Sequence, residues 1–431
     1  MRFTVKNVIH EVSLFLVLCV AMSASGQAQV QLSLKEAIEM SLRSNPDILR
    51  AEQEIKAADG RILQAGRIQN PELSFEWNEA PTNFDLSEAD ERDISISQSI
   101  EFPTRRGHRI DVATTEREIA ALRLDRTKAL VAGDVKRAYY QAKYSRQAIT
   151  NLEEQLRLLD DFRSVIQSRY ESGAVGYLDV IRTKIEIAQV VNELAEARRE
   201  ELRRQSEFRL LLGAATDQPI VLSDSLSQRP SPINSDSIIT ELMAKSATLK
   251  LRQGEIRRQD YALNLAKTAY FPDFTIGLAF QQRGEEPPFN ANDFTGTTTN
   301  SVGLQLGLSI PLWFWKEPAG QTDEAGAMLA IARLNETRSA RQVRSAISQA
   351  VAAAQVSGEQ LRVFQTSLLI DIEDILETGM QQYRTNQLDL VNLFDIFRST
   401  RKARSEYLRA LVNYAIALAD LEVAGELPFQ D

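Results

Sequence analysis

The sequence has few of the residues on which enzyme active sites are most often built. Its 431 residues include one cysteine, Cys19, and two histidines, of which His108 lies outside the N-terminal segment. A single cysteine excludes an internal disulfide bond and a zinc site made of cysteines. No phosphate-binding glycine loop, GxSxG element or HExxH element is present. We therefore predict that the protein is not an enzyme and has no cofactor and no metal site.

An excess of positive charge is also missing. The net charge of −9 leaves no basic surface for nucleic acid, so we predict no nucleic-acid partner. Neighbouring acids such as Glu153 and Glu154 are more typical of solvated helix faces than of acid–base pairs. An exported hydrolase that uses His108 and such carboxylates remains a minor alternative. Glycine (19) and proline (13) are scarce, which favours helices.

Beyond the N-terminus, long hydrophobic runs are absent as well. Basic residues precede an apolar run at residues 12–22, and small residues follow up to Ala28. This pattern predicts a signal peptide over residues 1–28, and therefore export. The run is shorter than the roughly 20 apolar residues that cross a bilayer. Lipidation of Cys19 stays open, although Leu18 stands where a small residue is expected.

A ten-residue pattern of alternating apolar and polar residues occurs twice. The first copy is ISISQSIEFP at residues 94–103, and the second is VGLQLGLSIP at residues 302–311. Alternation with a period of two is typical of a β-strand with one apolar face. Both copies end at a proline that precedes a long helical pattern.

A further alternating segment precedes each copy, so the chain contains two repeats. These segments are PELSFEW, which begins at Pro71, and PDFTIGLAF, which begins at Pro272. Each repeat has the order helix, strand, strand, long helix, helical hairpin. We place the repeats at residues 29–232 and 233–431. The predicted strands cover residues 72–78, 93–102, 273–281 and 301–310.

Two hairpins so far apart in the chain predict an assembly of several chains. An isolated hairpin is marginally stable, and membrane barrels need about eight strands or more. Several chains that each contribute four strands would form a barrel, with 313-WFW-315 in an aromatic girdle at the membrane interface. The predicted lipid-facing residues are Ile94, Ile96, Ile100, Phe102, Val302, Leu304, Leu306, Leu308 and Ile310.

The helical segments are too long for an ordinary globular domain. About 70 residues separate Pro103 from Gly173, and about 75 separate Pro311 from Asn386. At about 1.5 Å per residue, each helix would extend over roughly 105–110 Å. The returning segment is interrupted near residues 213–235, where we expect a belt of irregular structure. Gly173 and Asn386 suit left-handed turns between antiparallel helices.

The doubled order of elements, the proline-ended strands and the hairpin turns resemble the TolC family of outer-membrane efflux proteins over about residues 30–426. The resemblance implies a fold that is mainly α-helical with a membrane β-barrel portion. It implies a homotrimer with a twelve-stranded barrel in the outer membrane and an α-helical tunnel in the periplasm. It also implies a passive duct that works with a periplasmic adaptor and an inner-membrane transporter.

The resemblance assigns roles to residues near the hairpin turns. In the family, a tyrosine, an arginine and aspartates close the tip, and an acidic ring narrows the bore. Leu388 stands in place of the arginine and Asn392 in place of one aspartate, so we expect a different latch, between Tyr383 and Asp179. The expected gate residues are Asp395, Asp389, Asn392, Tyr383 and Asp179. The tips expected to contact the adaptor contain Gly173, Val175, Gly176, Asn386 and Leu388.

The branch of the family that exports cobalt, zinc and cadmium, or copper and silver, is the most similar. The segments NPELSFEW and SQSIEFPTRRGHR carry this likeness, although PTRR stands where the branch often has a turn with glycine and lysine. Multidrug efflux and type I secretion use the same architecture and stay open. A secreted periplasmic coiled-coil scaffold, from another class, would explain the long helices and leave the strands unexplained.

Overall fold

The computed structural model describes residues 30–78, 91–213, 220–224, 226, 229–285, 297–367 and 369–426. The predicted signal peptide, with Cys19, lies outside the described residues. The central parts of the two predicted loops between strands also lie outside them.

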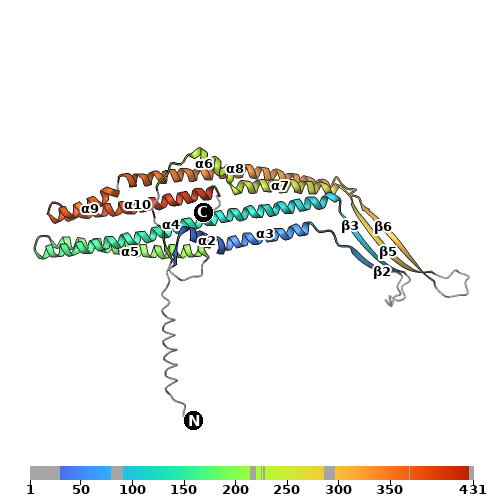
Figure 1. Cartoon of the computed structure of the whole chain (residues 1–431), viewed down its shortest axis with the longest axis horizontal. Helices are drawn as coiled ribbons and strands as arrows, with labels where there is room; N and C mark the ends of the chain where they lie inside the picture. Colours follow the sequence, from blue (N-terminus) through green and yellow to red (C-terminus); the bar gives the residue numbers. More distant parts are fainter. Residues whose placement is uncertain are drawn as a thin grey trace, which may run out of the picture. The chain divides into compact units, whose positions relative to one another are not determined.

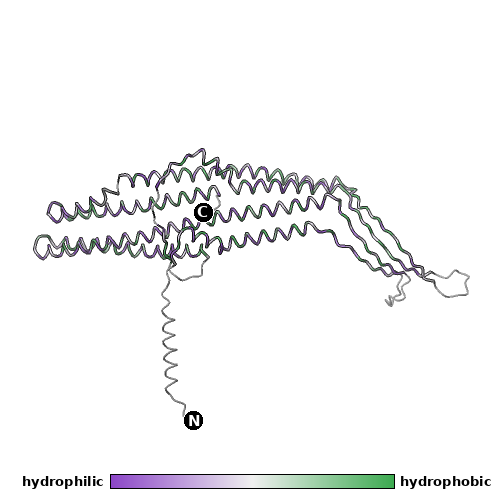
Figure 2. Tube along the Cα trace, in the orientation of Figure 1, coloured by the Kyte–Doolittle hydropathy of each residue, from purple (hydrophilic) through white to green (hydrophobic). Residues whose placement is uncertain are grey.

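The described residues fall into two units. The hairpin unit contains the described parts of Met1–Leu49, Lys128–Leu242 and Ala346–Asp431, and the strand unit contains those of Arg50–Thr127 and Met243–Ser345. Two long helices contribute residues to both units, α4 (Pro103–Glu171) and α8 (Glu317–Ser367) (Figure 1). No helix in the described ranges is long and apolar enough to cross a membrane, and Figure 2 shows hydrophilic residues recurring along the helices.

Two antiparallel helical hairpins dominate the hairpin unit (Figure 1). The first joins α4 to α5 (Tyr177–Leu212), and the second joins α9 (Leu369–Arg384) to α10 (Leu390–Ala424). At the turns, φ is 75° for Gly173 and 62° for Asn386. Glycine and asparagine adopt this left-handed conformation more readily than other residues. The predicted left-handed turns are therefore confirmed.

A shared hydrophobic core holds the two hairpins together. Apolar residues that recur at three- and four-residue spacing lie on the facing sides of the helices. The buried members of this core are Leu159, Phe162, Ile166, Val180, Val190, Tyr383, Leu390, Leu393, Phe394 and Phe397. Full burial of one such side chain contributes about 1.5–3 kcal/mol, so packing of the two hairpins on each other stabilises both turns.

A small parallel sheet in the hairpin unit corrects the expectation of a wholly irregular belt. Strand β1 (Val30–Leu32) pairs with β4 (Ile220–Leu222). The buried Tyr139 of α4 donates a hydrogen bond from Oη to Asp224 Oδ2 at 2.8 Å, and the Leu34 backbone N–H donates to the same oxygen at 2.8 Å. Burial raises the pKa of Tyr139, which keeps its hydroxyl protonated as a donor. Asp224 thereby ties β4 to α4 and to the start of α2.

The shorter helices follow the caps and prolines of the sequence. Helix α2 (Leu34–Ser44) begins after Ser33, whose side chain forms a capping box with Glu36. Proline 46 begins α3 (Pro46–Ala65). The segment after the interruption near residues 213–235 forms two helices, α6 (Ser235–Lys245) and α7 (Ala247–Lys267), followed by the 3₁₀ turn η2 (Thr268–Tyr270). The break falls at Ser246, whose hydroxyl caps α7 by accepting from the Leu249 N–H at 3.4 Å.

Four antiparallel strands form the sheet of the strand unit, in the order β2-β3-β5-β6. They are β2 (Glu72–Asn78), β3 (Glu91–Ile100), β5 (Asp273–Glu285) and β6 (Thr297–Ser309). Strands β5 and β6 extend beyond their predicted ends, since Gly284 still pairs with Thr298. Pairing continues there after the apolar alternation has stopped, so the sequence pattern did not indicate the extension.

Two residues that we predicted within strands lie beyond the strand ends. Phe102 follows β3, and its ring stacks on Phe271 with the centroids 4.2 Å apart. Its backbone N–H donates to Asp273 Oδ1 at 3.2 Å. Ile310 follows the end of β6 and is 59% exposed. Alternation of residue types persists past the last paired residue, which is why the sequence placed both in strands.

Candidate functional site

One face of the four-stranded sheet is apolar on every strand, apart from Gln98 of β3, which lies beside Ile276. The register places Phe75, Ile94, Phe280 and Val302 in one row, and Leu73, Ile96, Leu278 and Leu304 in the next. Ile100, Phe274 and Leu308 form another row, and Ile276 lies beside Leu306. All these side chains are 42–78% exposed in the single chain. Soluble monomers rarely expose so continuous an apolar surface, so this face is a candidate contact surface.

The opposite face of the sheet carries small and polar residues. Ser95 lies beside Ala279, and Ser97 beside Gly277. The hydroxyls of Ser74 and Ser95 share a hydrogen bond of 2.7 Å. A Cβ atom at Gly277 would approach the Ile96 carbonyl oxygen to 3.3 Å, so this position has little room for a larger residue. The two faces therefore differ in both polarity and size.

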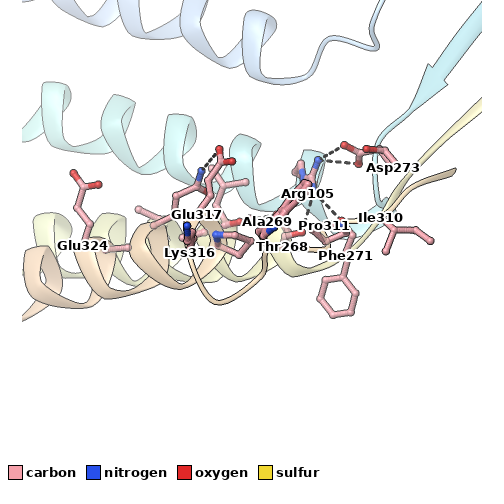
Figure 3. Close-up of a pocket in the computed structure, with 18 of the residues that line it drawn as sticks. Arg105, Thr268, Ala269, Phe271, Asp273, Ile310, Pro311, Lys316, Glu317 and Glu324 are labelled. Atoms are coloured by element: carbon pink, nitrogen blue, oxygen red, sulfur yellow. Dashed lines mark hydrogen bonds and ion pairs between the residues drawn. The ribbon is translucent and has the colours of Figure 1, made fainter.

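Arg105 fixes the junction between sheet and helices in the strand unit (Figure 3). Its Nη1 donates to both carboxylate oxygens of Asp273, at 2.8 and 2.7 Å, and its Nη2 donates to the Thr268 carbonyl oxygen at 2.9 Å. An open cavity of about 1000 Å³ lies beside this cluster and is also lined by Trp313 and Lys316. Arg105 belongs to the PTRR segment that departs from the family branch. The arginine of this segment orients the first turn of α4 against the start of β5.

Next to the end of β6, a short aromatic segment is exposed. Trp313, Phe314 and Trp315 are 65%, 52% and 59% exposed. The rings of Phe314 and Trp315 pack edge to face with centroids 5.1 Å apart. Aromatic residues of this kind are enriched where a protein crosses the boundary between membrane and water.

In the hairpin unit, Arg169 clasps the two hairpin tips together. It lies in the last turn of α4, and its Nη1 donates to the Tyr383 carbonyl oxygen at 3.1 Å. Its Nη2 donates to Asn386 Oδ1, and its guanidinium carbon lies 4.9 Å from the centre of the Tyr383 ring. Leu388 stands where the resembled family has an arginine. The first hairpin supplies an arginine to the tip instead, which the sequence did not predict. Arg169 stands four residues before the turn glycine Gly173, which places it near the tip, but nothing local in the sequence identifies its partners on the second hairpin.

Tyr383 is buried between this arginine and the core. The side chain is 3% exposed, and its ring packs on Phe162 with centroids 5.1 Å apart. Burial raises the pKa of Tyr383, while the positive charge of Arg169 opposes this shift. Among the described residues, the Tyr383 hydroxyl meets no partner in hydrogen-bonding geometry. The expected bond to Asp179 is therefore not formed within one chain, and Asp179 instead lies 3.6 Å from Arg182.

The acidic residues of the second hairpin have local partners. Asp389 is the N-cap of α10, and its side chain accepts from the Asn392 N–H at 2.8 Å. Asp395 lies one turn further and accepts from Arg398 Nη2 at 2.6 Å. Asp395 is 61% exposed at its side chain. The structure thus brings Asp389 and Asn392 together at the helix start and pairs Asp395 with an arginine that we had not singled out.

The hairpin tips are mainly exposed. Gly173 and Gly176 have open space around their Cα atoms, and Gly176 caps α5. Val175 and Leu388 are partly buried and pack against the core beneath the turns. Each tip therefore presents backbone and small residues above an apolar base.

Metal-ligating side chains do not gather among the described residues. No group of three or more histidine, cysteine, aspartate or glutamate residues among them could hold a metal ion. His108 lies near the start of α4 with Nδ1 3.8 Å from Asp111 Oδ2. His108 Nδ1 is shielded from solvent and has no hydrogen-bond partner among the described residues.

Known outer membrane efflux proteins are similar to this chain in sequence. A family model described as outer membrane efflux protein matches residues 37–214. The cobalt-zinc-cadmium resistance protein CzcC of Cupriavidus metallidurans is 22% identical over 402 residues, which cover 89% of this chain and 88% of that protein. The putative multidrug resistance outer membrane protein MdtQ of Escherichia coli is 22% identical, and the match covers 77% of this chain and 74% of that protein.

Solved structures share the fold at low sequence identity. A structure of CusC, described with its transmembrane channel formation, superposes with a TM-score of 0.73 at 15% identity and covers 93% of this chain and 94% of that one. The open state of the MtrE outer membrane channel of Neisseria gonorrhoeae gives a TM-score of 0.73 at 13% identity, covering 91% of this chain and 88% of that one.

Proposed function

We propose that the chain, which matches the outer membrane efflux protein model over residues 37–214, is the outer-membrane duct of a tripartite efflux pump. The duct is passive: it gives an exit path to substrates that an inner-membrane transporter and a periplasmic adaptor hand over. The four-stranded sheet of the strand unit lies in the outer membrane, and the helices of both units lie in the periplasm.

The exposed apolar face of the four-stranded sheet carries this proposal. Thirteen side chains in register make one side of the sheet apolar, whereas the other side is small and polar. Strands β2 and β6 are edges, which leaves two rows of unpaired backbone groups. Hydrocarbon cannot satisfy such groups, so a sheet in a bilayer must close. Three chains with four strands each would close a twelve-stranded barrel.

Antiparallel closure follows from the number of strands in each chain. Neighbouring strands alternate in direction across the order β2-β3-β5-β6, so β2 and β6 run in opposite directions. When β6 of one chain meets β2 of the next, the pair is again antiparallel. The homotrimer therefore needs no change of pairing mode at its seams.

The hairpin tips are the proposed contact with the adaptor. Gly173, Gly176 and Asn386 leave the turn backbone accessible, and Val175 and Leu388 supply apolar atoms beneath it. Turn backbone groups and small residues suit docking against the ends of partner helices. The partner is identified only as a periplasmic adaptor that bridges to an inner-membrane transporter.

The same end of the hairpin unit would contain the gate. Arg169 holds Tyr383 and Asn386 in place within each chain. The Tyr383 hydroxyl is shielded from solvent and has no hydrogen-bond partner among the described residues, so the proposed latch to Asp179 requires the tip to rearrange when the chains assemble. Asp395 would form the acidic ring around the threefold axis, with Asn392 about one turn and Asp389 nearly two turns nearer the tip.

The proposed cargo is divalent heavy-metal cations. The likeness to the cobalt-zinc-cadmium resistance protein, over 89% of this chain, supports it. Organic compounds are the alternative, because the match to MdtQ is equally identical over a smaller share of the chain. Growth of cells lacking this protein in zinc, cobalt or cadmium salts, compared with growth in organic toxins, separates the two cargoes.

A pair of arginine substitutions on β6 tests the membrane proposal. Leu306 is 72% exposed on the apolar face beside Ile276, and Gln305 lies on the opposite face beside Gly277. Leu306→Arg should destabilise the inserted protein by about 2–4 kcal/mol if it lies near the bilayer midplane. Gln305→Arg should insert normally and change the conductance. Insertion is measured by detergent extraction of outer membranes, and conductance in planar bilayers.

Equal tolerance of both substitutions would contradict the assignment of faces. Recovery of the unmodified protein as a periplasmic monomer, without detergent, would contradict the duct itself. That second result would favour the coiled-coil scaffold.

A further inference from the structure

Arg398 stands between two carboxylates with very different exposure. Its Nη2 donates to Asp395 Oδ1 at 2.6 Å, one turn earlier in α10. Its Nη1 lies 3.7 Å from Glu186 Oε2, on α5 of the other hairpin. The Asp395 side chain is 61% exposed, whereas that of Glu186 is 4% exposed. One guanidinium therefore serves an exposed and a buried partner at once.

The buried partner holds the arginine in place. Glu186 Oε1 is shielded from solvent and has no hydrogen-bond partner among the described residues. An ionised carboxylate in such a site is costly without an opposite charge nearby. Arg398 is the cation that the structure provides for Glu186. An exposed ion pair, by contrast, contributes little and exchanges with solvent and ions. Arg398 is thus hydrogen-bonded to Asp395 and is attracted at the same time by the buried charge of Glu186.

We propose that Arg398 determines how strongly the acidic ring at the gate binds cations. This inference rests on the proposed function, because it needs three copies of Asp395 around one bore. A cation that enters the ring competes with Arg398 for the carboxylate of Asp395. Glu186 attracts the same guanidinium, which weakens the Arg398–Asp395 pair and favours binding of the cation. Arg398 is a specificity-determining residue, and Glu186 positions it.

Two substitutions should change cation block in opposite directions. Arg398→Gln leaves Asp395 without its local counter-charge, so half-block by Mg²⁺ or La³⁺ should occur at about tenfold lower concentration than in the unmodified trimer. Glu186→Gln frees Arg398 to neutralise Asp395, so half-block should need a higher concentration. Both are measured on full-length mature trimers in planar bilayers.

A double substitution separates the effect on the acidic ring from misfolding caused by an unpaired buried charge. Arg398→Gln alone leaves Glu186 buried without a counter-charge. Glu186→Gln with Arg398→Gln removes both charges and should still give stronger block than the unmodified trimer. Arg398→Lys keeps the charge and should stay within about twofold of the unmodified protein.

Arg401→Gln is the matched control. Arg401 also lies on α10 and pairs with α5, with Nη2 3.3 Å from Glu193 Oε1. It tests whether loosening α10 from α5 is enough to change the block. An Arg401→Gln shift as large as that of Arg398→Gln would overturn the proposal, and so would unchanged block in both Arg398→Gln and Glu186→Gln.

Failure of the proposed function gives a different result. A trimer that inserts and shows no conductance refutes the duct, and the ring with it. A conducting trimer in which Asp395→Ala leaves the block unchanged refutes the ring at Asp395, and therefore the role of Arg398, while the duct stands.

Discussion

At the scale of single residues, Arg169 has the clearest consequence. It joins two turns that are more than two hundred residues apart in the sequence, through Tyr383 and Asn386. Arg169→Gln should lower the free energy of unfolding by about 1–3 kcal/mol, because hydrogen bonds and a cation–π contact with a charged group are lost. The tips should separate more often and the resting conductance should rise. Hydrogen exchange at both turns and closed-state conductance measure these effects.

Arg163→Gln is the control for this residue. Arg163 lies two turns earlier on α4 and is 55% exposed, paired 3.4 Å from Asp160 on the same helix. Its loss removes the same charge without touching the second hairpin. If resting conductance rises equally in both variants, the clasp has no special role.

At the scale of elements, the β1–β4 sheet depends on a side chain from a helix. Tyr139 is buried in α4, and its hydroxyl reaches Asp224 just after β4. Tyr139→Phe should cost about 1–2 kcal/mol of unfolding free energy, since Asp224 loses a donor. Amide exchange in β1 and β4 should accelerate more than exchange in α5. Denaturant titration in detergent and hydrogen exchange give both values.

Tyr144→Phe provides the comparison on the same helix. Tyr144 is partly buried, and it lies one turn and a half further along α4. A loss of stability no greater for Tyr139→Phe than for Tyr144→Phe would show that Asp224 does not hold the strands through this hydroxyl.

At the scale of the whole molecule, the two sheet edges predict the seam between chains. A cysteine at Ser74 of the edge strand β2 should form disulfides with cysteines introduced on β6 of another chain, at Ser301, Gly303 or Gln305. Oxidation should give a covalent species of three chains that a thiol reductant disperses. Denaturing electrophoresis with and without reductant measures it.

The inner strand β3 gives the control for this experiment. Ser95 lies opposite Ser74 within the chain, so a cysteine pair at these positions should close inside one chain and leave it monomeric on the gel. Ladders of indefinite length from the edge pair would indicate open stacking of sheets instead of a closed trimer.

The sequence by itself determined the order of elements and the faces of the strands. These features are local: a period of two in the strands, a period near 3.6 in the helices, prolines at helix starts and Gly173 and Asn386 at the turns each act within a few residues. For this reason the apolar set from Ile94 to Leu308 and the long helices α4 and α5 could be predicted, while strand ends at Phe102 and Ile310 could not.

Only the tertiary structure decided which polar and charged groups meet. Arg169 reaches Tyr383, Arg398 reaches Glu186, and Tyr139 reaches Asp224, each across a sequence separation of at least 85 residues. In the sequence, these arginines and acids are indistinguishable from the many solvated charges on long helices. Their partners are set by how the hairpins pack, and packing depends on the whole core and not on any local pattern.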